Sequence, residues 1–402
     1  MQPPVTAIDQ KSLDAFVAAL GTEAWRDRMA QFATLSASQS RVGGNLLQRH
    51  CIEVTIERLR RQPLSRQPSV AELRIASYAA DAIATIEQLS GYGRERWLTI
   101  LRTALQGDAC LTAPFHLLRT AAMQRARGFT VQFAAFEDGA TFDLLIRRDG
   151  VEAELVCDII SAEEGHGIHR STWFTLLDRI TPDLQLWLRA HPGRHLLKMT
   201  LPNGLRTENA SELIPILSAR INAILQDGRR GEDDKTAMLR FDPLMMATAR
   251  ADDLGLVPRL RQEFGPEAHL AATTVSDSLF VIAARAAQEN DVASSVRRRL
   301  DVAAPARLSG TRPGIVAMFI EDTDQTEWRL LRDQLQLEGE IRQFMTHPEA
   351  GNVVAVTCSS RLELFGLPDA ETEGELRFCN TAHPDAKNDA LVPAIISSHQ
   401  LK

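Results

Sequence analysis

The spacing of apolar residues divides the chain into a helical first part and a mixed second part. From Leu13 to Leu20 apolar side chains recur every three or four positions, which predicts an amphipathic helix. Further helices are expected over residues 25–35, 45–59, 70–89 and 95–106. Strand-like alternation is almost absent up to this point. We therefore predict an N-terminal helical region over residues 1–110.

The next segment alternates between helical and strand-like patterns. A helix ending at Gly128 is followed by apolar runs separated by glycine-containing turns. The expected order is helix, strands over 129–136, 141–146 and 151–160, a helix over 173–190 and a strand over 195–201. This α-β-β-β-α-β order predicts an α/β core over residues 111–205. The remaining residues, 206–402, continue with mixed patterns and are predicted to form a C-terminal α/β extension.

Carboxylates stand on the second and third predicted strands of this core. Residues two apart on a strand share a face, so Asp143 groups with Arg147, and Glu154 groups with Asp158. Three carboxylates side by side could hold Mg²⁺, which prefers oxygen ligands. The alternative is that these acids form the solvent-facing side of a half-buried antiparallel strand, a common pattern.

Six short segments carry a likeness to known proteins. They are 115–122, 127–131, 141–145, 156–161, 167–170 and 307–316. Together with the order of elements, they resemble uncharacterised bacterial members of the PD-(D/E)XK, or restriction-endonuclease-like, nuclease superfamily. The resemblance implies a restriction-endonuclease-like α-β-β-β-α-β core. Where the superfamily's motif is complete, it also implies hydrolysis of phosphodiesters by a metal-activated water.

The residues that carry the superfamily's chemistry are only partly present. Asp143 matches the superfamily's metal-binding aspartate. The glutamate that the superfamily carries on its helix would fall at or near Leu117, which cannot bind a metal. The Glu-x-Lys motif aligns best with residues 156–158, which read Val-Cys-Asp. A shifted alignment restores the acid as Glu154 but supplies no lysine. Arg147 could provide the positive charge, but a guanidinium does not deprotonate and is a poor proton shuttle.

We therefore expect a nuclease-like protein with an eroded metal site, which binds nucleic acid or a protein partner without efficient cleavage. One alternative is an active Mg²⁺-dependent nuclease, with Asp143, Glu154 and Asp158 as metal ligands and Arg147 as the electrophilic group. Another alternative is a protein-interaction scaffold without affinity for nucleic acid. Magnesium is expected as a cofactor only if the protein is active.

Contact with DNA or RNA is expected to be local. The net charge of -7 excludes a globally basic protein that coats nucleic acid. Within the loop after the third strand, His169 and Arg170 are candidates for phosphate contact. The run 297–299 is Arg-Arg-Arg at the predicted end of a helix, where basic residues usually complement the helix dipole.

The cysteines and the longest apolar runs indicate the compartment. The five cysteines are widely separated and form no Cys-x-x-Cys pair, which predicts reduced thiols rather than disulfides or a zinc site. No run approaches the ~20 apolar residues that a membrane helix needs, and the first residues lack the basic and apolar parts of a signal peptide. We expect no contact with a membrane and a cytoplasmic location.

Overall fold

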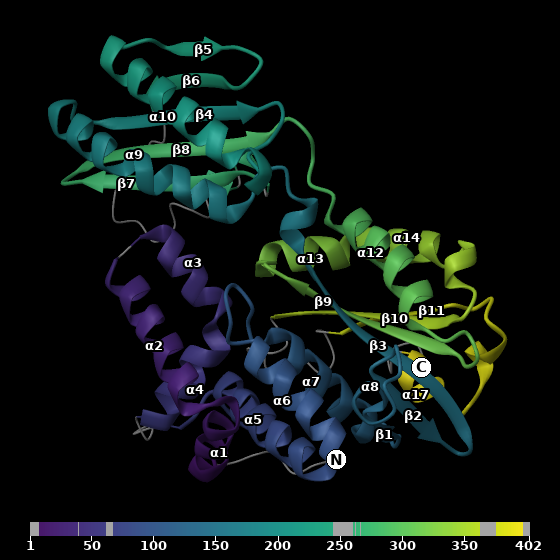
Figure 1. Cartoon of the computed structure of the whole chain (residues 1–402). Helices are drawn as coiled ribbons and strands as arrows, with labels where there is room; N and C mark the ends of the chain where they lie inside the picture. Colours follow the sequence, from purple (N-terminus) through teal and green to yellow (C-terminus); the bar gives the residue numbers. More distant parts are fainter. Residues whose placement is uncertain are drawn as a thin grey trace. The chain divides into compact units, whose positions relative to one another are not determined.

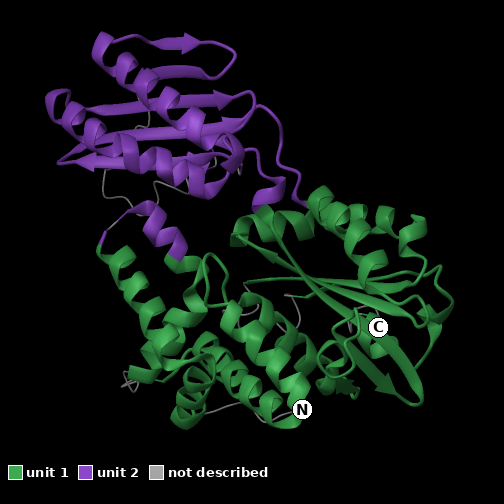
Figure 2. Ribbon diagram, viewed as in Figure 1, with its two compact units in different colours: residues 1–37, 47–162, 293–402 green, residues 38–46, 163–292 purple. Residues whose placement is uncertain are grey.

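The chain divides into two compact units, each described here by itself (Figure 2). Unit 1 contains residues 1–37, 47–162 and 293–402, and unit 2 contains residues 38–46 and 163–292. The computed structural model describes residues 8–38, 40–61, 67–243, 260–261, 263–265, 267–361 and 375–396.

Helices make up the N-terminal part of unit 1, as the apolar spacing predicts. Their bounds are α1 Gln10–Leu20, α2 Thr22–Ala37, α4 Cys51–Arg61, α5 Val70–Gln88 and α6 Gly91–Thr103, and helix α3 Arg41–Arg49 is shared with unit 2, which contains its residues up to Leu46. Helix α5 begins with a capping box, in which the side chains of Ser69 and Glu72 each accept a hydrogen bond from the other residue's backbone N–H. Side chains such as Phe16 and Trp97 belong to the same buried cluster as Leu155 of the sheet, so these helices share one core with the strands.

A mixed sheet forms the centre of unit 1, with strand order β1-β2-β3-β9-β10-β11 (Figure 1). Strands β1, β2 and β3 are antiparallel, β3, β9 and β10 are parallel, and β11 is antiparallel to β10. Asp149 and Gly150, both with positive φ, form the tight turn that the sequence predicts between β2 and β3. The strands are β1 Thr130–Gln132, β2 Leu144–Arg148, β3 Val151–Ser161, β9 Gly314–Glu321, β10 Val353–Ser360 and β11 Leu376–Cys379.

Helices cover both faces of this sheet. Leu155 and Ala317 pack in one cluster with residues of α7, whereas Val156 packs against Leu308, at the end of α12, on the other face. The two helices thereby bury alternate residues of β3. The remaining elements of this region are α7 Thr112–Ala126, α8 Ala134–Glu137, α12 Val292–Arg307, α13 Gln325–Asp333, α14 Gln336–Phe344, η3 Pro348–Ala350, η4 Pro384–Lys387 and α17 Val392–Ile395.

Unit 2 is built on a second mixed sheet, with strand order β5-β6-β4-β8-β7. Strands β4 and β8 are parallel, and the other described pairs are antiparallel. Helices α9 and α10 contribute Leu177 and Leu217 to the cluster that buries one face of the sheet. The elements are η1 Ala162–Gly165, α9 Arg170–Ala190, β4 Arg194–Leu201, η2 Thr207–Asn209, α10 Ala210–Asp227, β5 Gly231–Asp233, β6 Met238–Pro243, β7 His269–Val275 and β8 Ser278–Ala286.

The prediction that residues 173–190 and 195–201 complete the core of the first three strands is wrong. These residues form α9 and β4, which belong to unit 2. In unit 1 the parallel neighbour of β3 is β9, more than 150 residues further along the chain. Both β4 and β9 are apolar runs of similar length, so local pattern does not show which of them pairs with β3. The predicted boundaries at 110 and 205 therefore do not coincide with those of the units.

Two predicted strands are shorter than the sequence indicates. Of the apolar run 129–136 only Thr130–Gln132 is a strand, and Ala134–Glu137 turns into the short helix α8. The strand expected over 141–146 begins at Leu144, which places Asp143 just before β2. All five cysteines lie in the described ranges and carry free thiols, as predicted.

Candidate functional site

Asp143 is held from two sides at the start of β2. Its Oδ2 accepts a hydrogen bond of 2.6 Å from the backbone N–H of Cys157, and its Oδ1 accepts one of 2.6 Å from Nη2 of Arg307. The same guanidinium donates from Nη1 to the carbonyl of Cys157, at 2.8 Å. Burial raises the pKa of Asp143 above its ordinary value, and the charge of Arg307 opposes this rise. Both carboxylate oxygens thus have partners within the protein.

Glu154 is fully buried in β3 and binds the segment between α12 and β9. Its Oε2 accepts a hydrogen bond of 2.7 Å from the backbone N–H of Ser309, and its Oε1 accepts one from the Ser309 hydroxyl. Nη1 of Arg312 lies 3.4 Å from the same Oε1. A buried carboxylate is tolerated when its oxygens are hydrogen-bonded in this way. Glu154 therefore anchors residues 309–312 to the sheet.

Asp158, four residues further along β3, forms a bidentate pair with Arg299 of α12. Nε and Nη2 of Arg299 lie 2.7 and 2.9 Å from its two carboxylate oxygens. A parallel pair of charged hydrogen bonds is the strongest geometry for arginine and carboxylate. Asp158 is only 8% exposed, so this pair fixes α12 against the sheet.

Arg147 lies on the predicted face but does not reach the three acids. In the register of β2 and β3, Arg147 is opposite Glu152, and Leu145 is opposite Glu154. Nε of Arg147 lies 2.5 Å from Oε1 of Glu152, whose other oxygen is 2.7 Å from Nε of Arg312. The predicted role of Arg147 beside Asp143 therefore has no counterpart in this geometry.

The carboxylates lie on the α12 side of the sheet, but they do not form a shared metal site. Between Glu154 and Asp158 stands Val156, which is fully buried. Across the described ranges, no group of three or more His, Cys, Asp and Glu side chains is arranged to hold a metal ion. Mg²⁺ needs free oxygen ligands in octahedral geometry. The donor set does not fit Mg²⁺, because guanidinium and backbone donors occupy the oxygens that would bind it.

The arginines that neutralise the site lie outside the segment on which the prediction concentrated. Arg299 and Arg307 belong to α12, and Arg312 lies in the segment that follows. The run 297–299 was expected at a helix end, but α12 continues to Arg307 and places the run in its middle. The sequence offered a signal, since 307–316 is one of the segments on which the expected resemblance to the superfamily rests. Spacing alone does not reveal that these arginines meet β2 and β3.

The other predicted contact residues, His169 and Arg170, belong to unit 2. His169 precedes α9, and its Nδ1 accepts a hydrogen bond of 3.2 Å from the backbone N–H of Thr207. Burial lowers the pKa of His169. The backbone N–H of Arg170 donates to Oε2 of Glu163, at 2.5 Å. Both residues stabilise the start of α9, and their contact with nucleic acid stays a prediction.

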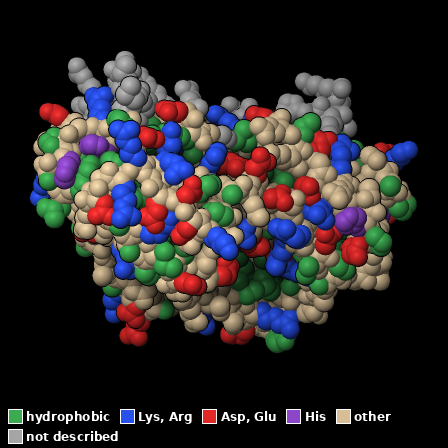
Figure 3. Space-filling model, turned by 90° about the horizontal axis from the view of Figure 1, so that it is seen from above, with side chains coloured by type: hydrophobic (Ala, Val, Ile, Leu, Met, Phe, Trp, Pro, Cys, Tyr) green, Lys and Arg blue, Asp and Glu red, His purple; other side chains and the backbone are tan. Residues whose placement is uncertain are grey.

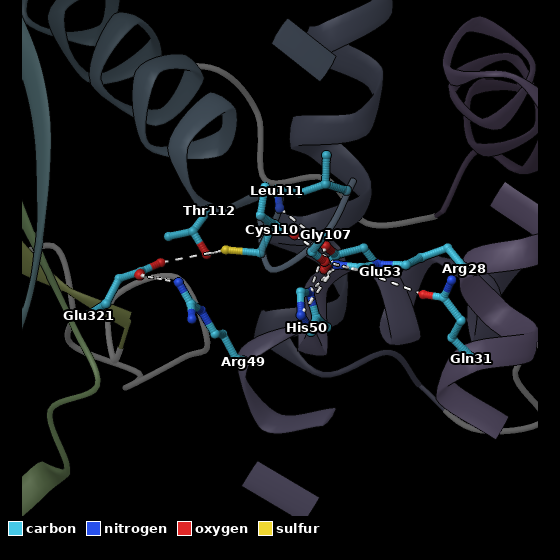
Figure 4. A network of polar contacts seen from close by, with 11 residues as sticks. Arg28, Gln31, Arg49, His50, Glu53, Gly107, Cys110, Leu111, Thr112 and Glu321 are labelled. Atoms are coloured by element: carbon cyan, nitrogen blue, oxygen red, sulfur yellow. Dashed lines mark hydrogen bonds and ion pairs between the residues drawn. The ribbon is translucent and has the colours of Figure 1, made fainter. Parts of the chain in front are cut away.

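A second polar centre, which the sequence did not suggest, lies at the carboxyl ends of β3, β9 and β10 (Figure 4). Glu321 at the end of β9 accepts a long hydrogen bond of 3.6 Å from Cys110 Sγ and lies 3.9 Å from Nη2 of Arg49. Burial and the neighbouring charge of Asp322 raise the pKa of Glu321. A small cavity at this edge is lined by Arg49, Glu321, Asp322 and Arg361, among others. The carboxyl ends of parallel strands are a common place for ligands.

The polar contacts of this centre continue to the start of α7 (Figure 4). Oε1 of Glu53 accepts a hydrogen bond of 3.2 Å from the backbone N–H of Leu111 and lies 3.3 Å from Nδ1 of His50. Arg28 donates to the carbonyls of Gly107 and Ala109, each at 2.8 Å. These contacts fix the loop before α7, which is a structural role.

Comparison with known protein families, with characterised proteins and with solved structures finds no significant match.

On the face drawn in Figure 3, acidic and basic side chains are interspersed. Among the helices that the structure describes, none combines the length and the apolar character needed to cross a bilayer.

Proposed function

We propose that this protein is a restriction-endonuclease-like protein whose metal site has been replaced by ion pairs, and that it binds nucleic acid or a protein partner without cleaving it. The hydrogen bond from Arg307 to Asp143 carries this proposal. It places a fixed positive charge beside the carboxylate for which the superfamily resemblance implies a metal.

The order of elements in unit 1 supports the proposed relationship. Apart from the short helix α8 between β1 and β2, the elements α7, β1, β2, β3, α12 and β9 of unit 1 come in the order α-β-β-β-α-β. Residues 163–292, which form most of unit 2, are inserted between β3 and α12. We infer that α12 and β9, from a later part of the chain, supply the second half of the α-β-β-β-α-β order expected from the sequence.

The chemistry of the replaced residues supports the loss of hydrolysis. Val156 stands where the superfamily's second acid is expected, and it is fully buried among apolar side chains. Asp158 stands where its lysine is expected, and it is paired with Arg299. Valine cannot take a proton from an attacking water, and both oxygens of the Asp158 carboxylate, which could, accept hydrogen bonds from Arg299. Neither position therefore offers a free group that activates water for phosphodiester hydrolysis.

The compartment belongs to the same proposal. The free thiols of all five cysteines favour a reducing environment, since disulfides form and persist in oxidising ones. We place the protein in the cytoplasm, where nucleic acid and protein partners are both present.

Incubation with labelled DNA and RNA, single- and double-stranded, tests the loss of cleavage. With Mg²⁺ or Mn²⁺ present, we expect the products to be the same for the wild-type protein and for Asp143→Ala. Metal-dependent cutting that Asp143→Ala abolishes would overturn the proposal in favour of an active nuclease.

Gel retardation of the same substrates tests the choice of partner. Phosphate contacts release counterions, so binding to nucleic acid should weaken steeply as salt rises. Arg170→Glu should weaken retardation further if the start of α9 contacts phosphate, and Arg229→Glu, an exposed arginine of unit 2, serves as the control. Absence of retardation at low salt would exclude binding to nucleic acid and leave a protein as the partner.

A further inference from the structure

A groove of about 550 Å³ lies in the N-terminal helices of unit 1, between α2 and α4. Its volume is within the range of small-molecule sites. The apolar part of its lining consists of Met29, Ala30, Phe32, Ala33, Leu47 and Val54. None of the contacts of the ion-paired site described above involves these residues. The groove is therefore independent of the proposed nuclease-like function.

The groove exists because the facing side chains are short. Ala30 and Ala33 lie on one side of α2, and Val54 lies on the facing side of α4. Ala33 is exposed, and Val54 is 36% exposed although it is apolar. An apolar hollow that side chains leave open to solvent is a typical place for an apolar ligand.

The helices that form the groove are antiparallel, which gives it two different ends. Trp25 of α2 donates a hydrogen bond of 2.8 Å to Glu57 of α4, and the Phe32 ring stacks on His50, just before α4, at 5.0 Å. The start of α2 therefore lies beside the end of α4. The lining at that end is basic, with Arg26 from α2 and two arginines from α4, Arg58 and Arg61.

The positive charge at this end exceeds the negative charge. Three arginines and one carboxylate, Glu57, line the groove. Glu57 accepts hydrogen bonds from Trp25 and Arg60 and also pairs with Arg61. The side chains of Arg58 and Arg61 are 46% and 69% exposed, while their partners Glu72 and Glu57 are 3% and 12% exposed, so each guanidinium keeps a solvent-facing part beside its ion pair. An anionic group can therefore bind at this end.

The dimensions favour a slender ligand. The lining positions on α2 extend from residue 26 to residue 36, which corresponds to about 15 Å of helix. Divided by this length, the volume gives a mean cross-section of roughly 40 Å², whereas a helix with its side chains is about 10 to 12 Å wide. A single alkyl chain fits within these dimensions.

We propose that this groove binds a fatty acid. Its alkyl chain lies along Ala30, Ala33 and Val54, where it buries apolar surface. Its carboxylate lies at the basic end beside Arg26 and Arg61. The apolar lining of the groove provides affinity for the alkyl chain. The arginines select an anionic head group over a neutral or cationic head group on a chain of equal length.

Displacement of a fluorescent fatty acid from the full-length protein tests the proposal, with all ligands below their micelle concentrations. Dodecanoate, dodecanol and dodecylamine share one chain length and differ in the charge of the head. We expect saturable binding at one site, and displacement by dodecanoate at a concentration at least tenfold lower than by the alcohol or the amine. Absence of displaceable binding, or equal displacement by all three, would overturn the proposal.

Two substitutions locate the ligand. Ala33→Trp fills the groove and should weaken dodecanoate binding at least tenfold. Ala24→Trp, at an exposed position of the same helix outside the lining, should leave binding unchanged. Arg26→Glu should weaken dodecanoate and improve dodecylamine. Thermal unfolding of each variant shows whether it is folded, and a folded Ala33→Trp protein that binds like the wild type would place the ligand elsewhere and refute the proposal.

Discussion

Nη2 of Arg307 lies 2.6 Å from Oδ1 of Asp143, so a guanidinium from the end of α12 occupies a carboxylate that the sequence predicts as a metal ligand. The two residues are 164 positions apart in the sequence. Their pairing decides both how the candidate site is held together and why it does not fit a metal ion.

Removal of this guanidinium should destabilise the protein in a pH-dependent way. We expect Arg307→Ala to lower the free energy of unfolding by about 2 kcal/mol at pH 7, because it leaves Asp143 buried and charged. The pKa of Asp143 is already raised by burial, and without Arg307 it should rise further. A raised carboxyl pKa lowers stability as pH rises through it, so the loss should be smaller near pH 4 than at pH 7.

Urea unfolding at both pH values measures this effect. The double variant Asp143→Asn/Arg307→Ala removes the buried charge as well, and it should be more stable at pH 7 than Arg307→Ala alone. Equal losses at pH 4 and pH 7 would show that Arg307 acts through packing rather than through its charge.

Glu154 and Glu152 provide a matched pair on one strand. Glu154 is fully buried and binds Ser309, whereas Glu152 makes exposed ion pairs with Arg147 and Arg312. Replacement of Glu154 by Gln should cost about 1 to 3 kcal/mol of unfolding free energy, because a buried acceptor of two hydrogen bonds is changed. Glu152→Gln should cost about 0.5 kcal/mol or less. Chemical denaturation that ranks the two in the opposite order would contradict the anchoring role of Glu154.

Acid sensitivity should depend on His116. This side chain is buried, and its Nε2 lies 3.0 Å from the carbonyl of Ala317. Burial lowers its pKa to about 4. The unfolded chain, with an ordinary pKa near 6.5, therefore binds the proton first, and stability should fall as pH drops from 6.5 to 4. This difference in pKa corresponds to a loss of roughly 3 kcal/mol of unfolding free energy once the pH has fallen to 4.

Stability measured against pH for His116→Gln checks this expectation. The variant should lose part of that slope between pH 6.5 and 4, because burial also lowers the pKa of His269 to about 4, whereas His191→Gln, at an exposed position, should keep all of it. An unchanged slope in His116→Gln would assign the acid sensitivity to other groups.

A buried ion triad should make Glu375 important for stability. Its Oε2 lies 2.5 Å from Nη2 of Arg127 and 2.9 Å from Nε of Arg377. Burial alone would raise its pKa, but the guanidiniums around it hold the pKa below its ordinary value. Glu375→Ala leaves two largely buried guanidiniums without this carboxylate and should cost about 3 to 5 kcal/mol.

The matched control for this triad is Glu338→Ala, which removes an exposed pair with Arg342. It should cost about 1 kcal/mol or less in thermal or chemical unfolding. Similar losses of unfolding free energy for Glu375→Ala and Glu338→Ala would show that a buried ion pair contributes no more to stability here than an exposed one.

The sequence by itself determined the local features of the site. The period of two along a strand puts Glu154 and Asp158 on one face, and the Asp149-Gly150 pair fixes the turn that aligns β2 with β3. These features follow from short-range backbone geometry, which neighbouring residues are enough to specify.

Only the tertiary structure decided which strand pairs with β3 and which side chains neutralise its acids. The local pattern offered β4 as the next strand, whereas β9 occupies that position, and α12 brings Arg299 and Arg307 to the carboxylates. The cost of closing a chain loop grows only slowly with its length, so an inserted unit between β3 and α12 adds little to the cost of pairing β3 with β9. Partners that distant leave no periodic trace in the sequence, and the donors that occupy the carboxylate oxygens become evident only in three dimensions.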